Sequence, residues 1–265
     1  LRVMLSKKKQ KILDKVSKKQ PIICLTSYTA PIAKIADKFA DIILVGDSVG
    51  PVLYGLESTK KVSLQMMIQH ATAVVKNTKK ALIAVDMPFG SYEENEMIAY
   101  ENAKKIITET GADAVKVEGG EKISGTLKYL TEKGILVIGH IGMLPQSCGG
   151  KYEVYGKSDL QKKQIFRDLK ILEEAGVFLI VLECILEKLA KEIICKSSTP
   201  IIGIGASKDC DGQILVVEDL LGLTDFESKF LKKYTNIKKI ISDSLSKFVS
   251  EVKEKKYPSK KHLYK

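Results

Sequence analysis

Eight short runs rich in Val and Ile recur along the chain, separated by longer segments with a helical spacing of apolar residues. This alternation is typical of repeated strand–helix units, whose strands pair in parallel. None of the runs contains proline, and none alternates cleanly between apolar and polar residues, as expected for strands covered on both faces. The predicted strands are Ile22–Thr26, Ile42–Val45, Ala81–Val85, Ala114–Val117, Ile135–Ile138, Phe178–Leu182, Ile201–Ile204 and Ile214–Val217.

The segments between these runs carry helix start and stop signals. Pro31 suits a first helical turn, Ser63 and Ser158 suit N-caps, and glycines follow several of the segments. The predicted helices are about 31–39, 63–76, 92–110, 121–133, 158–175 and 186–196, with two further amphipathic helices at 5–19 and 237–252.

Eight such units in about 200 residues favour an α/β fold, a (β/α)₈ barrel, over an open doubly wound sheet. A dinucleotide-binding sheet is the structural alternative, but the stretch GIGASK at 203–208 lacks the third glycine of that fingerprint. The sequence shows no linker and no second core. We therefore expect one barrel domain over residues 1–265, with a basic N-terminal helix within 1–20 and a basic tail at 253–265.

The formal net charge of +11 could indicate nucleic acid or an anionic membrane as a partner. However, the excess lies at the two ends, and residues 21–250 carry equal numbers of basic and acidic groups. No run approaches the roughly 18 apolar residues of a membrane-spanning helix, and no apolar segment of a secretory signal follows the basic N-terminus. We expect a cytoplasmic protein without a nucleic-acid or membrane partner, whose five cysteines are free thiols.

Three carboxylates stand where neighbouring strands of the expected barrel end. Asp47, Asp86 and Glu118 belong to strands 2, 3 and 4, at the rim where such barrels carry their active sites. Uncompensated carboxylates close together are costly unless a cation joins them, and oxygen ligands favour a hard divalent ion, first of all Mg²⁺. The alternative is that Asp47 and Asp86 only cap the helices that follow them.

Further polar residues occupy the ends of strands 4, 5 and 6. Glu183 is the candidate general base, because burial behind the apolar run 177–182 raises a carboxyl pKa; the alternative is a buried glutamate paired with a lysine. Lys116 could bind an anion or serve only as an ion-pair partner, and His140 could hydrogen-bond an oxyanion or be a core histidine. A metal, a base and an anion-binding lysine together suggest proton abstraction beside a carbonyl group.

Seven stretches of the chain resemble the ketopantoate hydroxymethyltransferase family, in the family's order and over about residues 20–262. They are LVGDSVG at 44–50, AVDMPF at 84–89, AVKVEGG at 114–120, GHIGMLPQ at 139–146, VLEC at 181–184, PIIGIGA at 200–206 and CDGQILV at 210–216. The resemblance implies a TIM barrel of the phosphoenolpyruvate/2-oxo-acid superfamily type, with an N-terminal helix and an extra C-terminal helix.

The resemblance also implies an activity and roles for particular residues. The family transfers a one-carbon unit from methylenetetrahydrofolate, a cosubstrate, to 3-methyl-2-oxobutanoate and gives 2-dehydropantoate, the first step of pantothenate synthesis. Asp47 and Asp86 are implied to bind Mg²⁺, with Glu118 supporting it directly or through water, and Glu183 to remove the C3 proton. The implied substrate-binding residues are Asp47, Ser48, Asp86, Lys116 and His140. A homo-oligomer, usually a decamer, is implied as well.

The sequence departs from the family pattern away from these positions. The loop at 147–157 is short, and Thr29, Tyr155, Ser207 and Glu218 replace a usual Asp, Gln, Gly and His. These departures affect the expected loop closure and folate contacts rather than the class of activity. The alternatives are a related metal-dependent lyase or aldolase acting on another 2-oxo acid, and a nucleic-acid-binding protein that uses its basic ends.

Overall fold

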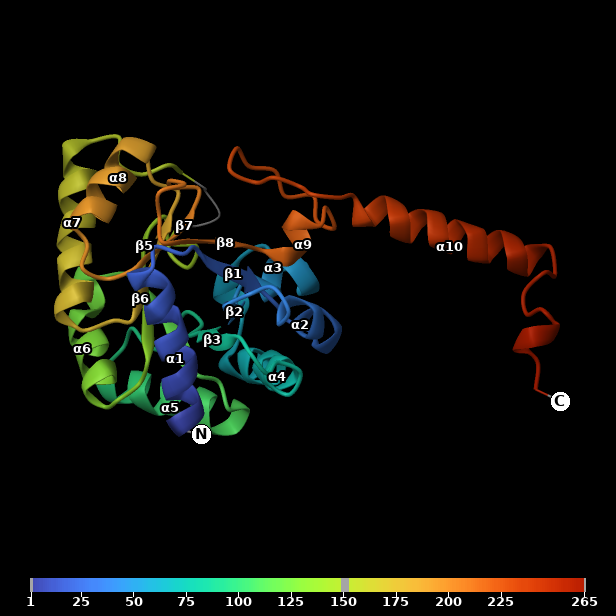
Figure 1. Ribbon diagram of the computed structural model, residues 1–265, viewed down its shortest axis with the longest axis horizontal. Coiled ribbons are helices and arrows are strands. Elements are labelled where there is room, and N and C mark those ends of the chain that lie inside the picture. The colour runs from blue at the N-terminus through green and yellow to red at the C-terminus, as the bar shows by residue number, and fades with distance from the viewer. Residues whose placement is uncertain (1, 149–152, 265) are drawn as a thin grey trace. The chain divides into compact units, whose positions relative to one another are not determined.

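The computed structural model describes residues 2–148 and 153–264, with side chains from residue 7 onward, so residues 149–152 of the short loop lie outside the described part. The chain divides into two compact units, Leu1–Val216 and Val217–Lys265. In the first, eight parallel strands pair in chain order and close into a barrel, which confirms the predicted fold (Figure 1). The strands are β1 (Ile22–Thr26), β2 (Ile42–Val45), β3 (Leu82–Asp86), β4 (Ala114–Glu118), β5 (Val137–Gly142), β6 (Leu179–Glu183), β7 (Ile201–Ile204) and β8 (Gly212–Leu215).

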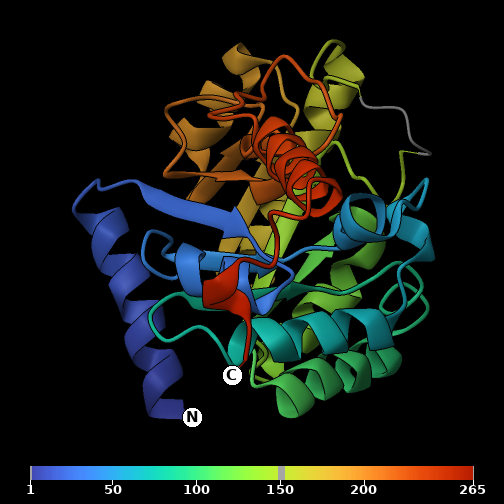
Figure 2. The same ribbon diagram turned by 90° about the vertical axis from the view of Figure 1, so that its right-hand side faces the viewer.

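Helices surround the barrel (Figure 1, Figure 2). They are α1 (Arg2–Ser17), α2 (Ala30–Ala36), α3 (Val49–Tyr54), α4 (Leu64–Val75), α5 (Glu96–Thr110), α6 (Ser124–Glu132), α7 (Asp159–Glu174) and α8 (Glu187–Lys196). The predicted N-caps are confirmed, because Ser63 and Ser158 accept hydrogen bonds from backbone amides in the first turns of α4 and α7. Among the helices of the described chain, none is both long and apolar enough to cross a membrane.

Four strands, β3 to β6, end later than the sequence pattern predicts. Backbone pairing continues through their polar ends: Asp86 pairs with Lys116, and Gly142 pairs with Glu183. The candidate site residues of these strands are therefore part of the sheet rather than of the loops that follow it. The pattern also missed the short helix α3 and the early start of β8 at Gly212.

Two apolar clusters stabilise the first unit. An outer cluster lies between the strands and the surrounding helices, and an inner cluster fills the barrel. Alternate residues of the strands form the inner cluster, which includes Ile22, Leu82, Ala114, Ile138, Leu179 and Ile202. Ile12 of α1 joins this cluster and is 1% exposed, so α1 covers the amino-terminal end of the barrel.

The basic N-terminal helix forms ion pairs with carboxylates that lie just before strands. Lys8 Nζ lies 2.7 Å from Asp113, ahead of β4, and Lys15 Nζ lies 2.5 Å from Asp41, ahead of β2. Lys11 lies 3.3 Å from the same Asp41 carboxylate. Part of the positive charge of the N-terminal segment is therefore paired within the fold.

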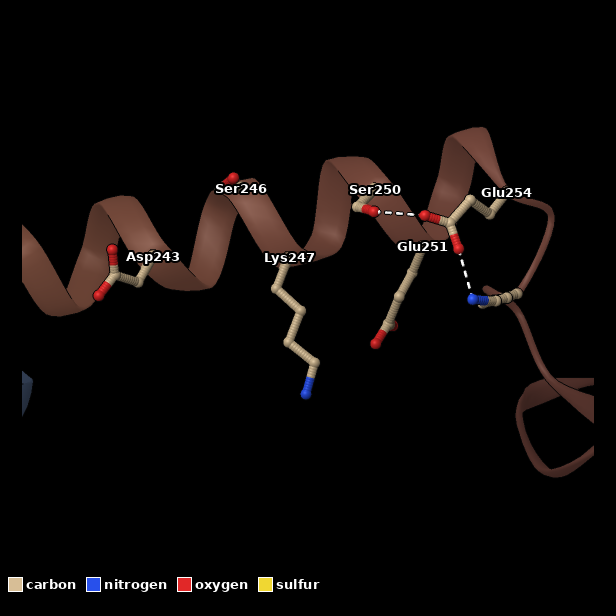
Figure 3. A pocket seen from close by; sticks show the side chains of 7 residues that line it. Asp243, Ser246, Lys247, Ser250, Glu251 and Glu254 are labelled. Carbon is tan, nitrogen blue, oxygen red and sulfur yellow. Dashed lines mark hydrogen bonds and ion pairs between the residues drawn. The ribbon is translucent and has the colours of Figure 1, made fainter.

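The second unit consists of α9 (Val217–Leu220), a loop, α10 (Ile237–Lys253) and a short 3-10 helix, η3 (Lys260–His262). One side of α10 is polar: Ser250 donates a hydrogen bond to Glu254, which also pairs with Lys256 (Figure 3). Six apolar side chains of α10 are exposed, namely Ile240, Ile241, Leu245, Phe248, Val249 and Val252. The single-domain organisation and the tail at 253–265 stay predictions.

Asp41 provides a test of the contact between α1 and the barrel. Burial alone would raise the pKa of Asp41, but the Ile23 amide and the ammonium groups of Lys15 and Lys11 hold it below its ordinary value. A depressed carboxyl pKa stabilises the folded protein above the unfolded pKa of about 3.9, and this contribution is lost as the pH falls through the folded pKa. We expect Asp41→Asn to lower the free energy of unfolding by about 1–3 kcal/mol at pH 7, and by less at pH 3.

Guanidinium unfolding followed by circular dichroism measures this effect. The control is Glu57→Gln, whose carboxylate is 92% exposed and lies 3.7 Å from Lys61; it should change the free energy by less than about 0.5 kcal/mol. A loss in Asp41→Asn that is equally large at pH 7 and pH 3 would contradict the role of the charge.

Candidate active site

The polar residues at the carboxyl ends of β3 to β6 continue the inner face of the barrel. Side chains alternate between the two faces of a strand, so residues two positions apart share a face. The inner face reads Leu82, Ala84 and Asp86 on β3, Ala114, Lys116 and Glu118 on β4, Ile138 and His140 on β5, and Leu179, Val181 and Glu183 on β6. The four strands therefore change from apolar to charged at the same end of the barrel, and the charged side chains are buried.

Asp47 and Asp86 form a buried pair of carboxylates. The Asp47 amide donates to Asp86 Oδ2 at 3.0 Å. Burial, together with the charges of Asp86 and Glu118, raises the pKa of Asp47 to about 8, against the opposing effects of Lys116 and Gln146. Gly46 leaves room beside this pair, since a Cβ there would lie 3.4 Å from Asp86 Oδ2 and 2.8 Å from Ser48 Oγ.

Neither aspartate caps the helix that follows it, so the capping interpretation is wrong. The N-cap residue of α3 is Ser48, without a side-chain cap bond, and the N-cap of α5 is Asn95. The Asp47 carboxylate instead accepts from the Gln146 side chain at 2.8 Å. Both carboxylates are therefore directed to the centre of the cluster rather than to helix ends.

Lys116 lies between the carboxylates of β3 and β4. Its Nζ is 2.8 Å from Asp86 Oδ1, 3.9 Å from Glu118 Oε1 and 3.4 Å from His140 Nδ1. Burial alone would lower the pKa of Lys116, but Asp86, Glu118 and Asp47 raise it above its ordinary value, so the side chain stays charged. Lys116 is thus an ion-pair partner, as one of its two predicted roles requires, and its partner Asp86 belongs to the candidate site.

His140 links the carboxylates of β4 and β6. Its Nδ1 lies 3.3 Å from Glu118 Oε1, and its Nε2 lies 3.2 Å from Glu183 Oε2. Burial and the charge of Lys116 favour the neutral ring, but the two glutamates outweigh them and raise the pKa of His140 to about 9. Conversely, burial would raise the pKa of Glu118, but His140 and Lys116 hold it below its ordinary value.

The charges in this cluster do not balance. The cluster has two cationic side chains, Lys116 and protonated His140, and full ionisation of its carboxyl groups leaves two negative charges uncompensated. The four carboxyl groups are those of Asp47, Asp86, Glu118 and Glu183. Asp86 Oδ1 is buried without a hydrogen bond, because its contact with Lys116 lacks hydrogen-bond geometry. A bound dication would compensate the charge and lower the raised pKa of Asp47.

Two aspartates suit Mg²⁺, which commonly takes one or two carboxylates and fills its octahedron with water and substrate oxygens. Within residues 2–148 and 153–264 no three or more His, Cys, Asp or Glu side chains form a ready-made metal cage. Glu118 instead contacts His140, Lys116 and the Gln146 amide. The donor set therefore fits an ion held by Asp47 and Asp86, and the contacts of Glu118 suit support through water.

Ser48 stands beside Asp47 at the start of α3. Its Oγ lies 2.7 Å from the hydroxyl of the fully buried Tyr28, and the Tyr28 carbonyl lies 2.7 Å from His70 Nδ1. All the candidate residues predicted from the sequence thus lie at the carboxyl ends of β2 to β6.

Sequence reasoning assigned no role to three buried residues that contact the candidate site residues, namely Gln146, Tyr92 and Tyr28. Gln146 belongs to a stretch that matches the family, GHIGMLPQ, and that match is the signal that could have singled it out. Tyr92 and Tyr28 have no comparable signal, because their contacts join segments distant in sequence.

Comparison with known proteins gives consistent matches over most of the chain. The family model described as ketopantoate hydroxymethyltransferase matches residues 7–260. The 3-methyl-2-oxobutanoate hydroxymethyltransferase of Pelagibacter ubique is 49% identical over 96% of this chain and 99% of its own length. The protein of that name from Rhizobium etli is 45% identical over 93% of this chain and 91% of its own.

Solved structures with a similar fold are more distant in sequence. Phosphonopyruvate hydrolase, in a complex with oxalate and Mg²⁺, has a TM-score of 0.64 at 12% identity and covers 97% of this chain and 92% of its own. 2,3-Dimethylmalate lyase, a member of the PEP mutase/isocitrate lyase superfamily, has a TM-score of 0.60 at 11% identity and covers 93% and 88%. At these identities the likeness shows the fold alone.

The pair of Lys116 and Asp86 allows a test of the electrostatics of the cluster. Lys116→Met leaves Asp86 buried without its cation, and breaking a buried pair in this way costs about 3–5 kcal/mol. We expect that loss in the free energy of unfolding, measured with EDTA present. Lys116→Met combined with Asp86→Asn should recover much of it, because no unpaired charge then remains at this pair.

The control is Lys170→Met, which removes a 75%-exposed lysine that lies 3.5 Å from Glu174 on α7. It should leave stability within about 0.5 kcal/mol of the wild type. If Lys116→Met is as stable as the wild type, the electrostatic account of the cluster is wrong.

Proposed function

The chain belongs to the ketopantoate hydroxymethyltransferase family, and we propose that it transfers a hydroxymethyl group from methylenetetrahydrofolate to 3-methyl-2-oxobutanoate. The product is 2-dehydropantoate, which makes the protein a transferase of pantothenate and coenzyme A synthesis. The observation that carries the proposal for the site is the buried cluster at the ends of β2 to β6, whose six ionisable side chains suit enolisation of a 2-oxo acid.

We propose Mg²⁺ as the metal, held by Asp47 and Asp86, with Glu118 in a supporting position. The support is the uncompensated negative charge of the cluster and the raised pKa of Asp47. When bound, the ion acts as a Lewis acid on the keto group and increases the acidity of the neighbouring C–H bond.

The side chains around the aspartates suit an anionic substrate. Lys116 and His140 are both cationic, and the Ser48 hydroxyl can donate to a carboxylate or keto oxygen. We propose that these three residues bind the 2-oxo acid, and that Asp47 and Asp86 contribute to the same site. Burial strengthens these contacts, because few water molecules compete for them.

Glu183 is proposed as the base. Its side chain is 11% exposed, whereas those of His140, Lys116, Glu118 and Asp86 are 2–6% exposed, so Glu183 is the most accessible of these groups to an incoming substrate. Its Oε2 faces His140, so we assign proton uptake from C3 to Oε1. The enolate of the substrate then forms a C–C bond with the methylene carbon of the folate. Both C–N bonds of that carbon break, water supplies the hydroxyl group, and tetrahydrofolate leaves.

We further propose a cytoplasmic homo-oligomer, a decamer as the family resemblance implies. The exposed apolar row of α10 supports self-association, and the five free thiols support a reducing compartment. No nucleic-acid partner is proposed, because Lys8, Lys11 and Lys15 form ion pairs within the fold. Light scattering measures the mass of the assembly.

The lyase or aldolase alternative is not favoured. Relatives that are 44–49% identical over more than nine-tenths of the chain all carry the hydroxymethyltransferase name. The lyase and hydrolase structures match at 11–12% identity, a level that shows only a shared fold.

The proposed function predicts two reactions. With Mg²⁺ and methylenetetrahydrofolate, the enzyme should convert 3-methyl-2-oxobutanoate to 2-dehydropantoate, detected by mass spectrometry. Without folate, in D₂O, it should exchange the C3 proton of the 2-oxo acid, followed by NMR. Glu183→Gln should slow this exchange by about 10²–10⁴-fold, the usual contribution of a general base, and leave metal binding intact.

The matched control is Glu187→Gln, which removes a 60%-exposed carboxylate at the start of α8 and should exchange at the wild-type rate. Absence of product at micromolar wild-type enzyme would refute the transferase activity. Persistent exchange in Glu183→Gln would remove Glu183 as the base and leave the activity itself in place.

A further inference from the structure

Both polar side-chain atoms and the backbone amide of Gln146 form hydrogen bonds in the candidate active site, although Gln146 lies in the loop after β5. Its side chain is 1% exposed. Its Nε2 donates to Asp47 Oδ2 at 2.8 Å and to the Met87 carbonyl at 3.0 Å. Its backbone amide donates to Glu118 Oε2 at 3.0 Å. One residue therefore holds two carboxylates from different parts of the barrel, Asp47 after β2 and Glu118 at the end of β4.

Tyr92 is one of three partners that together fix which way the Gln146 side-chain amide points. Its hydroxyl donates to Gln146 Oε1 at 2.6 Å, and the hydroxyl oxygen accepts from the Glu118 amide at 3.2 Å. In the opposite orientation, Gln146 Oε1 would face the Asp47 carboxylate and the Met87 carbonyl, both of which only accept hydrogen bonds. The observed orientation is thus the one that satisfies all partners.

Tyr92 is suited to this role because it keeps its proton. Its side chain is 2% exposed. An ordinary phenol has a pKa of about 10, so the hydroxyl keeps its proton at neutral pH. The hydroxyl is therefore a permanent donor to Gln146 in a cluster that is otherwise rich in acceptors.

We propose that Gln146 and Tyr92 are positioning residues that hold Asp47 and Glu118 in the geometry that binds the metal. The inference rests on the metal site of the proposed function and adds two residues to it. Gln146 occupies one oxygen of each carboxylate, while Glu118 Oε1 faces His140 and Lys116. A fixed carboxylate loses less rotational freedom when an ion binds, so these contacts increase metal affinity.

A purely structural role predicts a different result. If Gln146 only attached its loop to the barrel, its removal would lower the melting temperature and leave metal affinity unchanged. Metal affinity is therefore the deciding measurement, and Mn²⁺ is a suitable probe because paramagnetic resonance reports its free concentration directly.

The test compares Gln146→Met, Tyr92→Phe and the double variant in the full chain. Gln146→Met keeps the length of the side chain and the backbone bond to Glu118 but loses the bond to Asp47. We expect Mn²⁺ binding to weaken about 10–100-fold, as is typical when a hydrogen-bond partner of a metal ligand is removed. Tyr92→Phe should weaken it less, about three- to tenfold, since the Gln146 amide remains but loses one of the three partners that orient it.

The double variant tests whether the two residues act together. Because Tyr92 acts through Gln146, the double variant should bind Mn²⁺ within about twofold of Gln146→Met alone. The control is Tyr100→Phe, which removes a phenol hydroxyl on α5, where the ring lies 6.0 Å from Tyr129. It should bind Mn²⁺ like the wild type.

Each other outcome overturns a stated part of the account. Unchanged Mn²⁺ affinity in Gln146→Met or, if that variant does not fold, in Tyr92→Phe overturns the positioning role. Additive losses in the double variant show that Tyr92 acts independently and overturn its proposed route. Absence of Mn²⁺ binding by the wild-type protein refutes the metal site of the proposed function itself, which distinguishes that failure from a failure of this inference.

Discussion

The two-residue repeat of side chains in a closed parallel barrel determines where the charged groups of this protein lie. The same strand faces that fill the barrel with Leu82, Ala114 and Leu179 continue, at the carboxyl ends, with Asp86, Glu118 and other charged residues. Because the barrel is closed, these faces have no route to solvent except through its mouth. The charged side chains are therefore buried together, and the other groups of the site offset the free-energy cost of removing these charges from water.

The fold compensates this buried charge in two ways. Lys116 and His140 neutralise part of the negative charge, and each keeps its proton because carboxylates lie within 3.3 Å. The remainder suits a divalent cation between Asp47 and Asp86. At the opposite end of the barrel α1 covers the apolar interior, and its lysines pair with carboxylates ahead of the strands. The basic N-terminus is thus part of the fold.

The repeat of strands and helices made the barrel and most of its site residues predictable, since each candidate is counted from a strand end. The exact strand ends were not, because pairing continues through polar residues such as Glu118 and Glu183. The contacts of Gln146 and Tyr92 could not be predicted either, because Gln146 meets Asp47 across 99 positions of the sequence and Tyr92 meets Gln146 across 54. Contacts of that range depend on the closed barrel rather than on any local pattern.

The central claim is that the buried cluster at the ends of β2 to β6 binds a metal and the 2-oxo acid together. Anomalous diffraction from crystals soaked with Mn²⁺ and 3-methyl-2-oxobutanoate tests it most directly. The account predicts one strong peak coordinated by Asp47 and Asp86, with the 2-oxo acid bound to the same ion and within reach of Glu183. A peak at another site, or a 2-oxo acid bound away from these residues, would contradict it.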